Sequence, residues 1–589
     1  MKDFFKYTLA TVLGIVIVQA FAAILGFIML IAISVGSQTT PTIEKGSVLR
    51  IKLTGELCER ATENPFAELM GNELLTSQGL DDLLAAIKVA KENDKIKGIY
   101  LEAGVMQADY ASFQELRKAL LDFKQSKKFI VAYGDNYSQG TYWVASVADK
   151  VLLNPSGIVD WHGIAAQPIF YKDLLEKIGV KMQVFKVGTF KSAVEPYILT
   201  SMSEANRLQV QSYIDDIWSG VCKDVAEARK VSVDSLNAYA NNYARLSLAE
   251  NYVKMQLVDS LAYIDGVRDR LRVLCDKEKE VKFVSPSELA KLDKPSSATE
   301  EIAVFYAEGD IVDEAAQNPF GGNTSQIVGS EVVKELDKLM NDENVKAVVL
   351  RINSGGGSAY ASEQMWRAIQ LLKAKKPVVV SMSGLAASGG YYMSCGADYI
   401  IAEPATLTGS IGIFGMVPDA SGLLTEKLGL HFDVVKTNTS ADFGAMGRPF
   451  NPEEANAMQQ YVNNGYALFL KRVAEGRGMK VEDVDKIAQG RVWTGNQALG
   501  IKLVDKIGTL QDAVQEAAKR AKLKDYAVTA APAKADWMEN LMKQATKDDY
   551  MEQKMQSVLG IYYRPLQFVG SLGQRAQIQA RIPYEPNLF

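Results

Sequence analysis

The sequence is poor in histidine, and its few cysteines show no metal-binding spacing. It has two histidines and four cysteines among 589 residues, and a formal net charge of −5. Cys58, Cys222, Cys275 and Cys395 are too scattered for a zinc or redox motif, so we expect free, mostly buried thiols. No basic cluster is present, which argues against nucleic acid as a partner. The sequence therefore predicts no metal site, no cofactor and no nucleic-acid partner.

The shortage of histidine also limits the choice of catalytic base. His162 follows Trp161, and His431 lies where we expect the edge of a strand. Neither belongs to a glycine-rich loop of the kind that holds a reacting group. A serine nucleophile without histidine needs another base, and lysine can serve where burial or nearby cations lower its pKa.

Charge is absent from one long stretch near the N-terminus. No charged residue occurs between Tyr7 and Val35, which is long enough for a helix to cross about 30 Å of hydrocarbon. A cleaved signal peptide is the alternative, but its apolar region is usually only about 7–15 residues. Lys2 and Lys6 place the N-terminus on the cytoplasmic side. We therefore expect a single-pass helix at residues 7–35, in contact with the lipid of the cytoplasmic (inner) membrane, with the rest of the chain periplasmic.

The remainder of the chain contains an internal repeat. Lys97–Leu101 resembles Lys346–Leu350, and Phe129–Asp149 resembles Val378–Asp398, both at an offset of 249 residues. Such self-similarity indicates a tandem duplication of one structural unit. In each copy, strand-like and helix-like segments alternate, which is typical of an α/β fold with a largely parallel sheet. Helices are expected at Leu80–Lys91 and Ser330–Met340.

These features predict the order of the domains. The expected parts are a cytoplasmic N-terminus at 1–6, a transmembrane helix at 7–35, a linker at 36–46, an N-terminal repeat at 47–290, a linker at 291–300, a C-terminal repeat at 301–530, and a helical and extended tail at 531–589.

Ser388 stands out because only the second copy carries it; Gln139 occupies the matching position of the first copy. It lies between Ala387 and Gly389, after a predicted strand and a short turn, and a helix can begin behind it. Free backbone N–H groups at the start of a helix can stabilise an oxyanion next to such a hydroxyl. The alternative is a serine that only caps the helix.

A second feature of the second copy is the glycine run in Asn353–Ser358. Three glycines after a strand present main-chain N–H groups to an anionic or polarised group. A phosphate loop is the obvious alternative, but the Gly-Lys-Ser/Thr ending is missing. The matching segment of the first copy, Glu102–Met106, has lost this run.

The first copy supplies a lysine that the second copy lacks. Lys191 corresponds to about Ala441, so each copy holds one half of a possible serine–lysine pair. This complementarity predicts one active site built from both copies, although most lysines are simply solvated. Ser410 follows the next predicted strand and can orient a neutral lysine by a hydrogen bond; its alternative is a turn serine. We expect the pair to form within one chain, because the covalent link raises the effective concentration of the two halves.

At this point the chain resembles the long, duplicated form of the bacterial signal peptide peptidase A family. The motifs that carry the resemblance are Asn353–Ser358, Ala387–Tyr391, Leu407–Gly412, Phe190–Pro196 and the terminal Arg581–Pro586. The resemblance implies a tandem duplication of a Clp protease/crotonase-like ββα-spiral domain. One departure is Gly355, because the family often has proline there, and proline would hold the loop stiff.

The resemblance also implies the roles of individual residues. Ser388 would be the nucleophile, Lys191 the general base and Ser410 the partner of the lysine. The backbone N–H groups of Gly356 and Gly389 would form the oxyanion hole.

The function implied is that of a membrane-anchored serine endopeptidase with a Ser-Lys dyad. It would degrade cleaved signal peptides, or other apolar extended peptides, at the outer face of the cytoplasmic membrane, as a homotetramer. Two alternatives belong to other classes. One is a non-catalytic membrane scaffold with a crotonase-like fold, which a fluorophosphonate probe would fail to label. The other is an enzyme acting on acyl-CoA thioesters, which the expected location disfavours because such thioesters are cytosolic.

Overall fold

The computed structural model describes residues 43–61, 77–278, 280–293, 296–315, 325–534 and 578–582, together with Gly14, Val18, Gln19 and Phe21. Within these residues, no helix combines the length and the apolar character needed to cross a membrane. The predicted helix at 7–35 lies outside the described residues except for those four positions. Most of the predicted tail, 535–577 and 583–589, also lies outside them.

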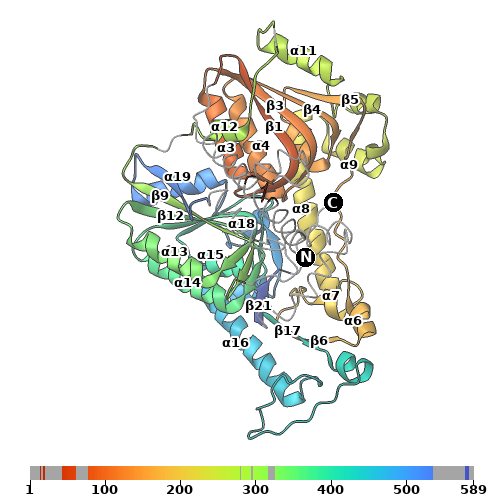
Figure 1. Cartoon of the computed structure of the whole chain (residues 1–589), viewed down its shortest axis with the longest axis vertical. Helices are drawn as coiled ribbons and strands as arrows, with labels where there is room; N and C mark the ends of the chain where they lie inside the picture. The colour runs from red at the N-terminus through yellow and green to blue at the C-terminus, as the bar shows by residue number, and fades with distance from the viewer. Residues whose placement is uncertain are drawn as a thin grey trace, which may run out of the picture.

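The first sheet belongs to the N-terminal repeat and is parallel throughout (upper part of Figure 1). Its central strands are apolar and buried on both faces, as expected for a parallel sheet covered by helices. The strands are β1 (Ser47–Cys58), β2 (Ser77–Gly79), β3 (Ile96–Gln107), β4 (Phe129–Tyr137), β5 (Lys150–Val159), β7 (Ser260–Leu261) and β8 (Phe283–Val284). The helices of this part are α3 (Leu80–Glu92), α4 (Tyr110–Lys124), α5 (Gln139–Ala145), α8 (Glu204–Arg229), α9 (Val233–Asn241), α10 (Ala249–Lys254), α11 (Ile264–Leu274) and α12 (Pro286–Ala290).

A second sheet belongs to the C-terminal repeat and repeats this design. It is parallel except where its edge strand β18 runs antiparallel to β16. The strands are β9 (Glu301–Glu308), β12 (Val345–Ser354), β14 (Val378–Ala387), β15 (Tyr399–Ala402), β16 (Leu407–Gly409), β18 (Val492–Thr494), β19 (Lys506–Ile507) and β20 (Ala527–Ala531). Its helices are α13 (Gly329–Asn341), α14 (Ala359–Lys373), α15 (Gly389–Ser394), α16 (Pro452–Arg477), α17 (Val481–Ile487), α18 (Gly495–Gly500) and α19 (Leu510–Ala521).

The duplication is visible in matching interactions of the two repeats. Arg229 at the end of α8 pairs with Asp259 at 3.1 Å, and Arg477 at the end of α16 pairs with Asp505 at 2.6 Å. Each aspartate also accepts a hydrogen bond from the backbone of a sheet strand. Tyr142 and Tyr391, 249 positions apart, each donate their hydroxyl to a leucine carbonyl. The internal repeat predicted from the sequence is therefore confirmed: the tyrosines keep the predicted offset of 249, and the arginines and aspartates lie at offsets of 248 and 246.

A third sheet contains strands from both repeats, and this shared sheet positions the candidate active site. Its strand order is β11 (Gln326–Val328), β10 (Asp310–Val312), β13 (Gly356–Ser358), β21 (Ile578–Arg581), β17 (Phe414–Asp419) and β6 (Lys181–Lys186). β6 comes from the first half of the chain, between α6 (Lys172–Ile178) and α7 (Glu195–Ile198), yet it pairs along its whole length with β17. The segment of the first repeat that contains α6, β6 and α7 thereby lies beside strand β17 of the second repeat (lower part of Figure 1).

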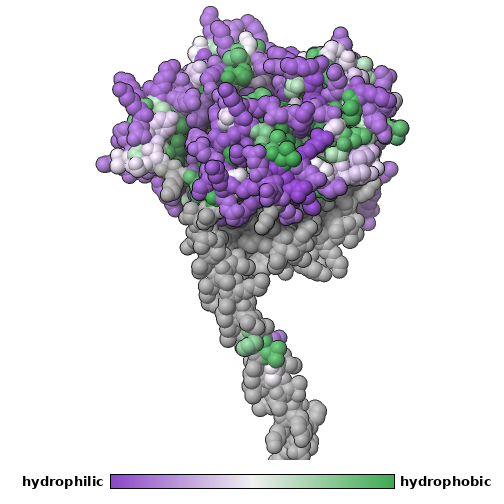
Figure 2. Space-filling view, turned by 90° about the horizontal axis from the view of Figure 1, so that it is seen from above, coloured by the Kyte–Doolittle hydropathy of each residue, from purple (hydrophilic) through white to green (hydrophobic). Residues whose placement is uncertain are grey.

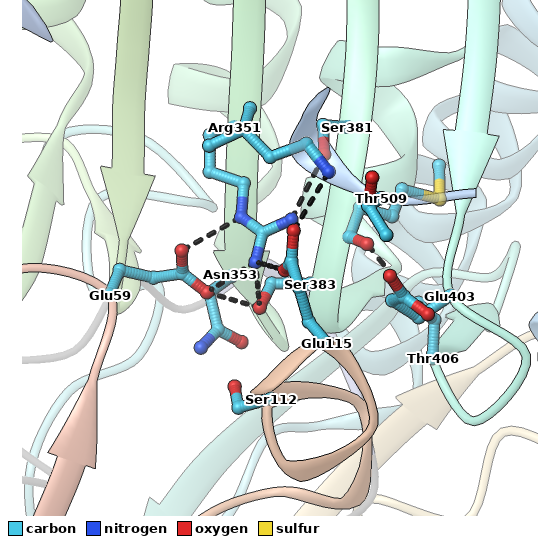
Figure 3. Close-up of polar contacts among 12 residues, drawn as sticks. Glu59, Ser112, Glu115, Arg351, Asn353, Ser381, Ser383, Glu403, Thr406 and Thr509 are labelled. Atoms are coloured by element: carbon cyan, nitrogen blue, oxygen red, sulfur yellow. Dashed lines mark hydrogen bonds and ion pairs between the residues drawn. The ribbon is translucent and has the colours of Figure 1, made fainter. Parts of the chain in front are cut away.

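A buried polar cluster also connects the repeats (Figure 3). Arg351 on β12 pairs with Glu59 at 2.7 Å and with Glu115 of α4 at 2.6 Å, and it donates to Ser381 and Ser383 of β14. All five side chains are almost completely buried. A charge buried without a partner is costly, so these pairs favour a single arrangement of the two repeats.

Several sequence-based expectations can be compared directly with the elements. The helices expected at Leu80–Lys91 and Ser330–Met340 are present and one residue longer at most ends. The cysteines are unpaired, and three of the four are buried. One expectation was wrong: His431 does not lie at a strand edge but in an irregular, exposed segment, because its apolar neighbours face solvent rather than a sheet.

Candidate active site

Ser388 lies at the end of β14, directly before α15, and its side chain is completely buried. The strand continues to Ala387, so the separate turn expected between strand and serine is absent. Instead the chain turns at Ser388 itself, whose φ of 55° and ψ of −111° are uncommon for a residue with a side chain. Such backbone strain, of the order of 1–3 kcal/mol, is concentrated at functional sites.

Lys191 reaches the same point from the loop between β6 and α7. Its Nζ lies 2.8 Å from Oγ of Ser388, 3.0 Å from the carbonyl oxygen of Ser410 and 3.1 Å from Oγ of Ser410. All three side chains have no exposed surface. The structure therefore brings together, within one chain, the serine of the second repeat and the lysine of the first.

The electrostatics of Lys191 are set by burial. In the described part of the chain its Nζ has no carboxylate partner, and its three polar neighbours are uncharged oxygens. Burial lowers the pKa of Lys191 well below its usual value of 10.5. The amine therefore loses its proton at a lower pH than a solvated lysine does, and the unprotonated amine can accept a proton.

Ser410 follows β16 and also has a positive φ, 49°. Its backbone N–H donates to the carbonyl of Arg491 at 2.7 Å, which fixes the turn. The turn at Ser410 thereby aims both its carbonyl and its hydroxyl at the lysine amine.

Sequence reasoning missed the loop that supports the lysine from behind. The N–H of Phe190 donates to the carbonyl of Gln489 at 2.8 Å, and the N–H of Gly490 donates to Ile411 at 2.8 Å. A Cβ on Gly490 would lie 2.6 Å from the Cα of Lys191, and Gly490 has a φ of +79°. Only glycine therefore fits here. The glycine itself was the available signal, but nothing in the sequence connects it with Lys191.

Two polar residues of α8 hold the lysine loop from another side. Gln209 donates to the carbonyl of Phe190 at 3.0 Å and to Ser192 at 2.9 Å, and its amide oxygen accepts from the N–H of Val492 at 3.1 Å. Ser192 in turn donates to Asn206 at 2.9 Å. Gln209 thus connects the lysine loop with β18 of the second repeat, a contact that spacing along the sequence does not reveal.

The glycine run lies beside Ser388. Gly356 has a φ of +98°, and a Cβ at this position would lie 2.7 Å from the backbone nitrogen of Gly389. The two glycines expected to supply oxyanion donors are therefore neighbours. In this structure the N–H of Gly356 donates to Oγ of Ser354 at 3.1 Å, and Gly389 opens α15.

The matching place in the first repeat is filled by a side chain. Gln139 accepts from the N–H groups of His162 and Gly163, and it donates to Gly163 and to the hydroxyl of Tyr110. The imidazole of His162 lies 3.7 Å from Asp160. In the first repeat, the side chain of Gln139 therefore occupies the position of the serine and is held there by hydrogen bonds within that repeat.

The comparisons with known proteins can be set beside this geometry. The model of peptidase family S49 matches residues 122–278 and again residues 370–524, which together exceed half of the chain. The chain belongs to peptidase family S49. Protease 4 of Salmonella typhi is 36% identical over 531 residues, which covers 85% of this chain and 83% of that protein. Protease 4 of Haemophilus influenzae is 35% identical over 525 residues, covering 84% and 83%.

This S49 peptidase also has more distant relatives. The chloroplastic serine protease SPPA of Arabidopsis thaliana is 30% identical over 490 residues, covering 82% of this chain and 70% of that protein. The Clp protease family model matches residues 314–405, the part that holds the glycine run and Ser388. The two S49 matches confirm the duplicated family form that the sequence motifs predicted. The protein is a serine protease with a Clp protease-like α/β fold.

Proposed function

We propose that this S49 peptidase hydrolyses peptides with a Ser-Lys dyad made of Ser388 and Lys191. The observation that carries the proposal is the buried amine of Lys191, 2.8 Å from Oγ of Ser388 and without a carboxylate partner among the described residues. A lysine paired with a carboxylate would stay protonated and could not act as a base.

The positions of Lys191, Ser388 and Ser410 support the following reaction steps. The unprotonated amine of Lys191 takes the proton of Ser388, whose oxygen bonds to the carbonyl carbon of the substrate. Ser410 orients the amine, and backbone N–H groups of Gly356 and Gly389 stabilise the developing oxyanion. Lys191 then gives the proton to the leaving amine. Water, activated by the same lysine, hydrolyses the ester and restores Ser388.

The substrates we propose are extended, apolar peptides such as cleaved signal peptides. The third sheet supports an extended substrate, because β13 runs beside the dyad and can pair with a peptide backbone. A relative in Enterococcus faecium, 36% identical over 235 residues, is named a putative signal peptide peptidase. The apolar stretch at 7–35 would anchor the protein in the cytoplasmic membrane, with the peptidase domains outside.

We further propose that the peptidase works as a homotetramer. The segment 428–446, at the lower end of Figure 1, exposes several large apolar side chains. They are Leu428, Leu430, Phe432, Val434, Val435, Phe443 and Met446, and Val435 is 99% exposed. By contrast, the face in Figure 2 is mainly hydrophilic, with small separate apolar patches. A second copy of the chain would cover this segment.

The direct test is cleavage of a synthetic signal peptide by the full-length protein, with fragments identified by mass spectrometry. Ser388→Ala and Lys191→Met should give no fragments, and Lys186→Ala should cleave like the wild type. Lys186 is the matched control because it lies five residues before Lys191, on β6. Fragments from Ser388→Ala above a tenth of the wild-type amount would refute the proposed nucleophile.

A further inference from the structure

One buried carboxylate near the lysine loop has no part in the reaction steps proposed above. Glu195 follows Lys191 by four positions and opens α7, and its side chain is only 1% exposed. Among the described residues no lysine, arginine or histidine pairs with it; its partners are uncharged donors. A buried carboxylate without a cation is costly unless hydrogen bonds satisfy it, so the arrangement of those bonds is informative.

The partners of Glu195 all lie at the start of α8. Its Oε1 accepts from the hydroxyl of Ser203 at 2.6 Å, and its Oε2 accepts from the N–H of Ser203 at 3.1 Å and from Nδ2 of Asn206 at 2.9 Å. Ser203 is the residue that caps this helix. The N-terminal end of a helix carries a partial positive charge, which favours a carboxylate there. Both oxygens of Glu195 are therefore used as acceptors.

The carboxylate sets the direction of the hydrogen bonds that follow. A carboxylate oxygen only accepts, so the amide of Asn206 must point its Nδ2 at Glu195 and its Oδ1 away from it. That Oδ1 accepts from the hydroxyl of Ser192 at 2.9 Å and from Nε2 of Gln209 at 3.1 Å. Asn206 and Gln209 are both almost completely buried, which leaves their amides little freedom to choose other partners.

The far end of this chain of hydrogen bonds holds the residues on both sides of Lys191. Nε2 of Gln209 donates to the carbonyl of Phe190 at 3.0 Å and to the hydroxyl of Ser192 at 2.9 Å. Lys191 lies between these two residues, and its Nζ is 2.8 Å from Oγ of Ser388. A displacement of about 1 Å in a catalytic group can cost about 10²-fold in rate, so the support of this loop bears directly on catalysis.

We propose that Glu195 is a positioning residue of the peptidase, which acts through Asn206 and Gln209 to hold the amine of Lys191 beside Ser388. This inference rests on the proposed function of Ser388 and Lys191. Glu195 is not itself a base or a nucleophile in this account. What it contributes is the direction of the hydrogen bonds, so a carboxylate placed one step further along the same chain should serve as well.

The test measures kcat and KM of the full-length protein on a synthetic signal peptide, per folded molecule as judged by near-UV circular dichroism. Glu195→Gln turns an amide N–H₂ toward donors of Ser203 or Asn206, and Asn206→Asp brings two carboxylates within hydrogen-bond distance. Each single variant should lower kcat at least about tenfold and leave KM within about twofold of the wild type.

The double variant Glu195→Gln/Asn206→Asp moves the carboxylate one step along the chain. The new amide at 195 can donate to the new carboxylate at 206, which accepts from Ser192 and Gln209 as the asparagine oxygen did. We expect kcat to return to within about threefold of the wild type, whereas independent damage from two substitutions would add. Glu204→Gln is the matched control: it removes an exposed carboxylate from the first turn of α8 and should change neither kcat nor KM.

The pH dependence of kcat provides a second measurement that a purely structural role would not move. Burial is what lowers the pKa of Lys191, and a lysine that is held less firmly becomes more accessible to water. The midpoint of the pH profile should therefore move to higher pH in each single variant and return in the double variant. A residue that only stabilised the fold would change the folded fraction and leave this midpoint in place.

The outcomes separate this inference from the function on which it rests. Wild-type kcat and midpoint in Glu195→Gln, an effect confined to KM, or a folded double variant as slow as the single ones would each overturn the positioning role and leave the dyad standing. Should a single variant not fold, a folded double variant with less than about a tenth of wild-type kcat still overturns it. A wild type that leaves the peptide intact refutes the proposed function and this inference together.

Discussion

Replacing Lys191 by methionine should abolish activity and also remove a specific pH dependence of stability. Methionine has a similar length and no charge, so it fills the buried space without the amine. Loss of a base that acts as a unit with its nucleophile costs about 10⁴–10⁶ in kcat. The oxygens of Ser388 and Ser410 lose a partner, which costs roughly 1–3 kcal/mol of stability.

The pH dependence has a definite sign. The pKa of Lys191 is lowered in the folded protein, so between that value and 10.5 the unfolded chain binds one more proton than the folded chain. Stability of the wild type therefore rises with pH across this window, by about 1.4 kcal/mol per unit relative to the methionine variant. This gain in the free energy of unfolding is complete above 10.5, the pKa of Lys191 in the unfolded chain. It is lost as pH falls toward the lowered pKa of the folded protein.

The assay is urea unfolding of both proteins at a series of pH values from 6 to 10, with activity measured on the same samples. Activity of the wild type should rise with pH and level off below 10.5. Lys186→Ala, the control, should behave as the wild type in both measurements. A difference in unfolding free energy between the wild type and Lys191→Met that stays constant with pH would refute the unprotonated lysine.

Three further predictions concern the lysine loop, the polar cluster between the repeats and the assembly of the dyad. Gly490→Ala should lower kcat at least about tenfold, because its Cβ would press on the backbone of Lys191; an unchanged kcat would show that the contact relaxes freely. Burial, followed by the charge of Glu115, raises the pKa of Glu403 to about 8, so stability should fall as pH rises from 4.5 to 8, and Glu403→Gln should show less of this fall in urea unfolding. Mixed and reassembled Ser388→Ala and Lys191→Ala proteins should remain inactive, whereas recovery of peptidase activity would place each site between two chains.

The sequence predicted the repeat and the candidate site better than it predicted their surroundings. The offset of 249 residues was enough to pair Ser388 with Gln139, and the complementary lysine then indicated a shared site. These predictions depend on residue types at matching positions, which a sequence displays directly. The resemblance to a family added the roles, which stay predictions until the variants are measured.

What the sequence could not predict depends on contacts between distant segments. Gln209 and Gly490 support Lys191 through backbone hydrogen bonds and close packing, and neither belongs to a motif. The pairing of β6 with β17, and of β21 with β13, joins strands that are hundreds of residues apart. The cluster around Arg351 likewise combines charges from both repeats, which look like ordinary solvated residues in the sequence.

The central claim is that Lys191 activates Ser388. The most direct measurement is labelling of the full-length protein with a fluorophosphonate, followed by mass spectrometric mapping of the modified residue. We expect one adduct, on Ser388, in the wild type and in Lys186→Ala, and none in Lys191→Met, where Ser388 is present but not activated. An adduct on another serine, or undiminished labelling of Ser388 in Lys191→Met, would contradict the account.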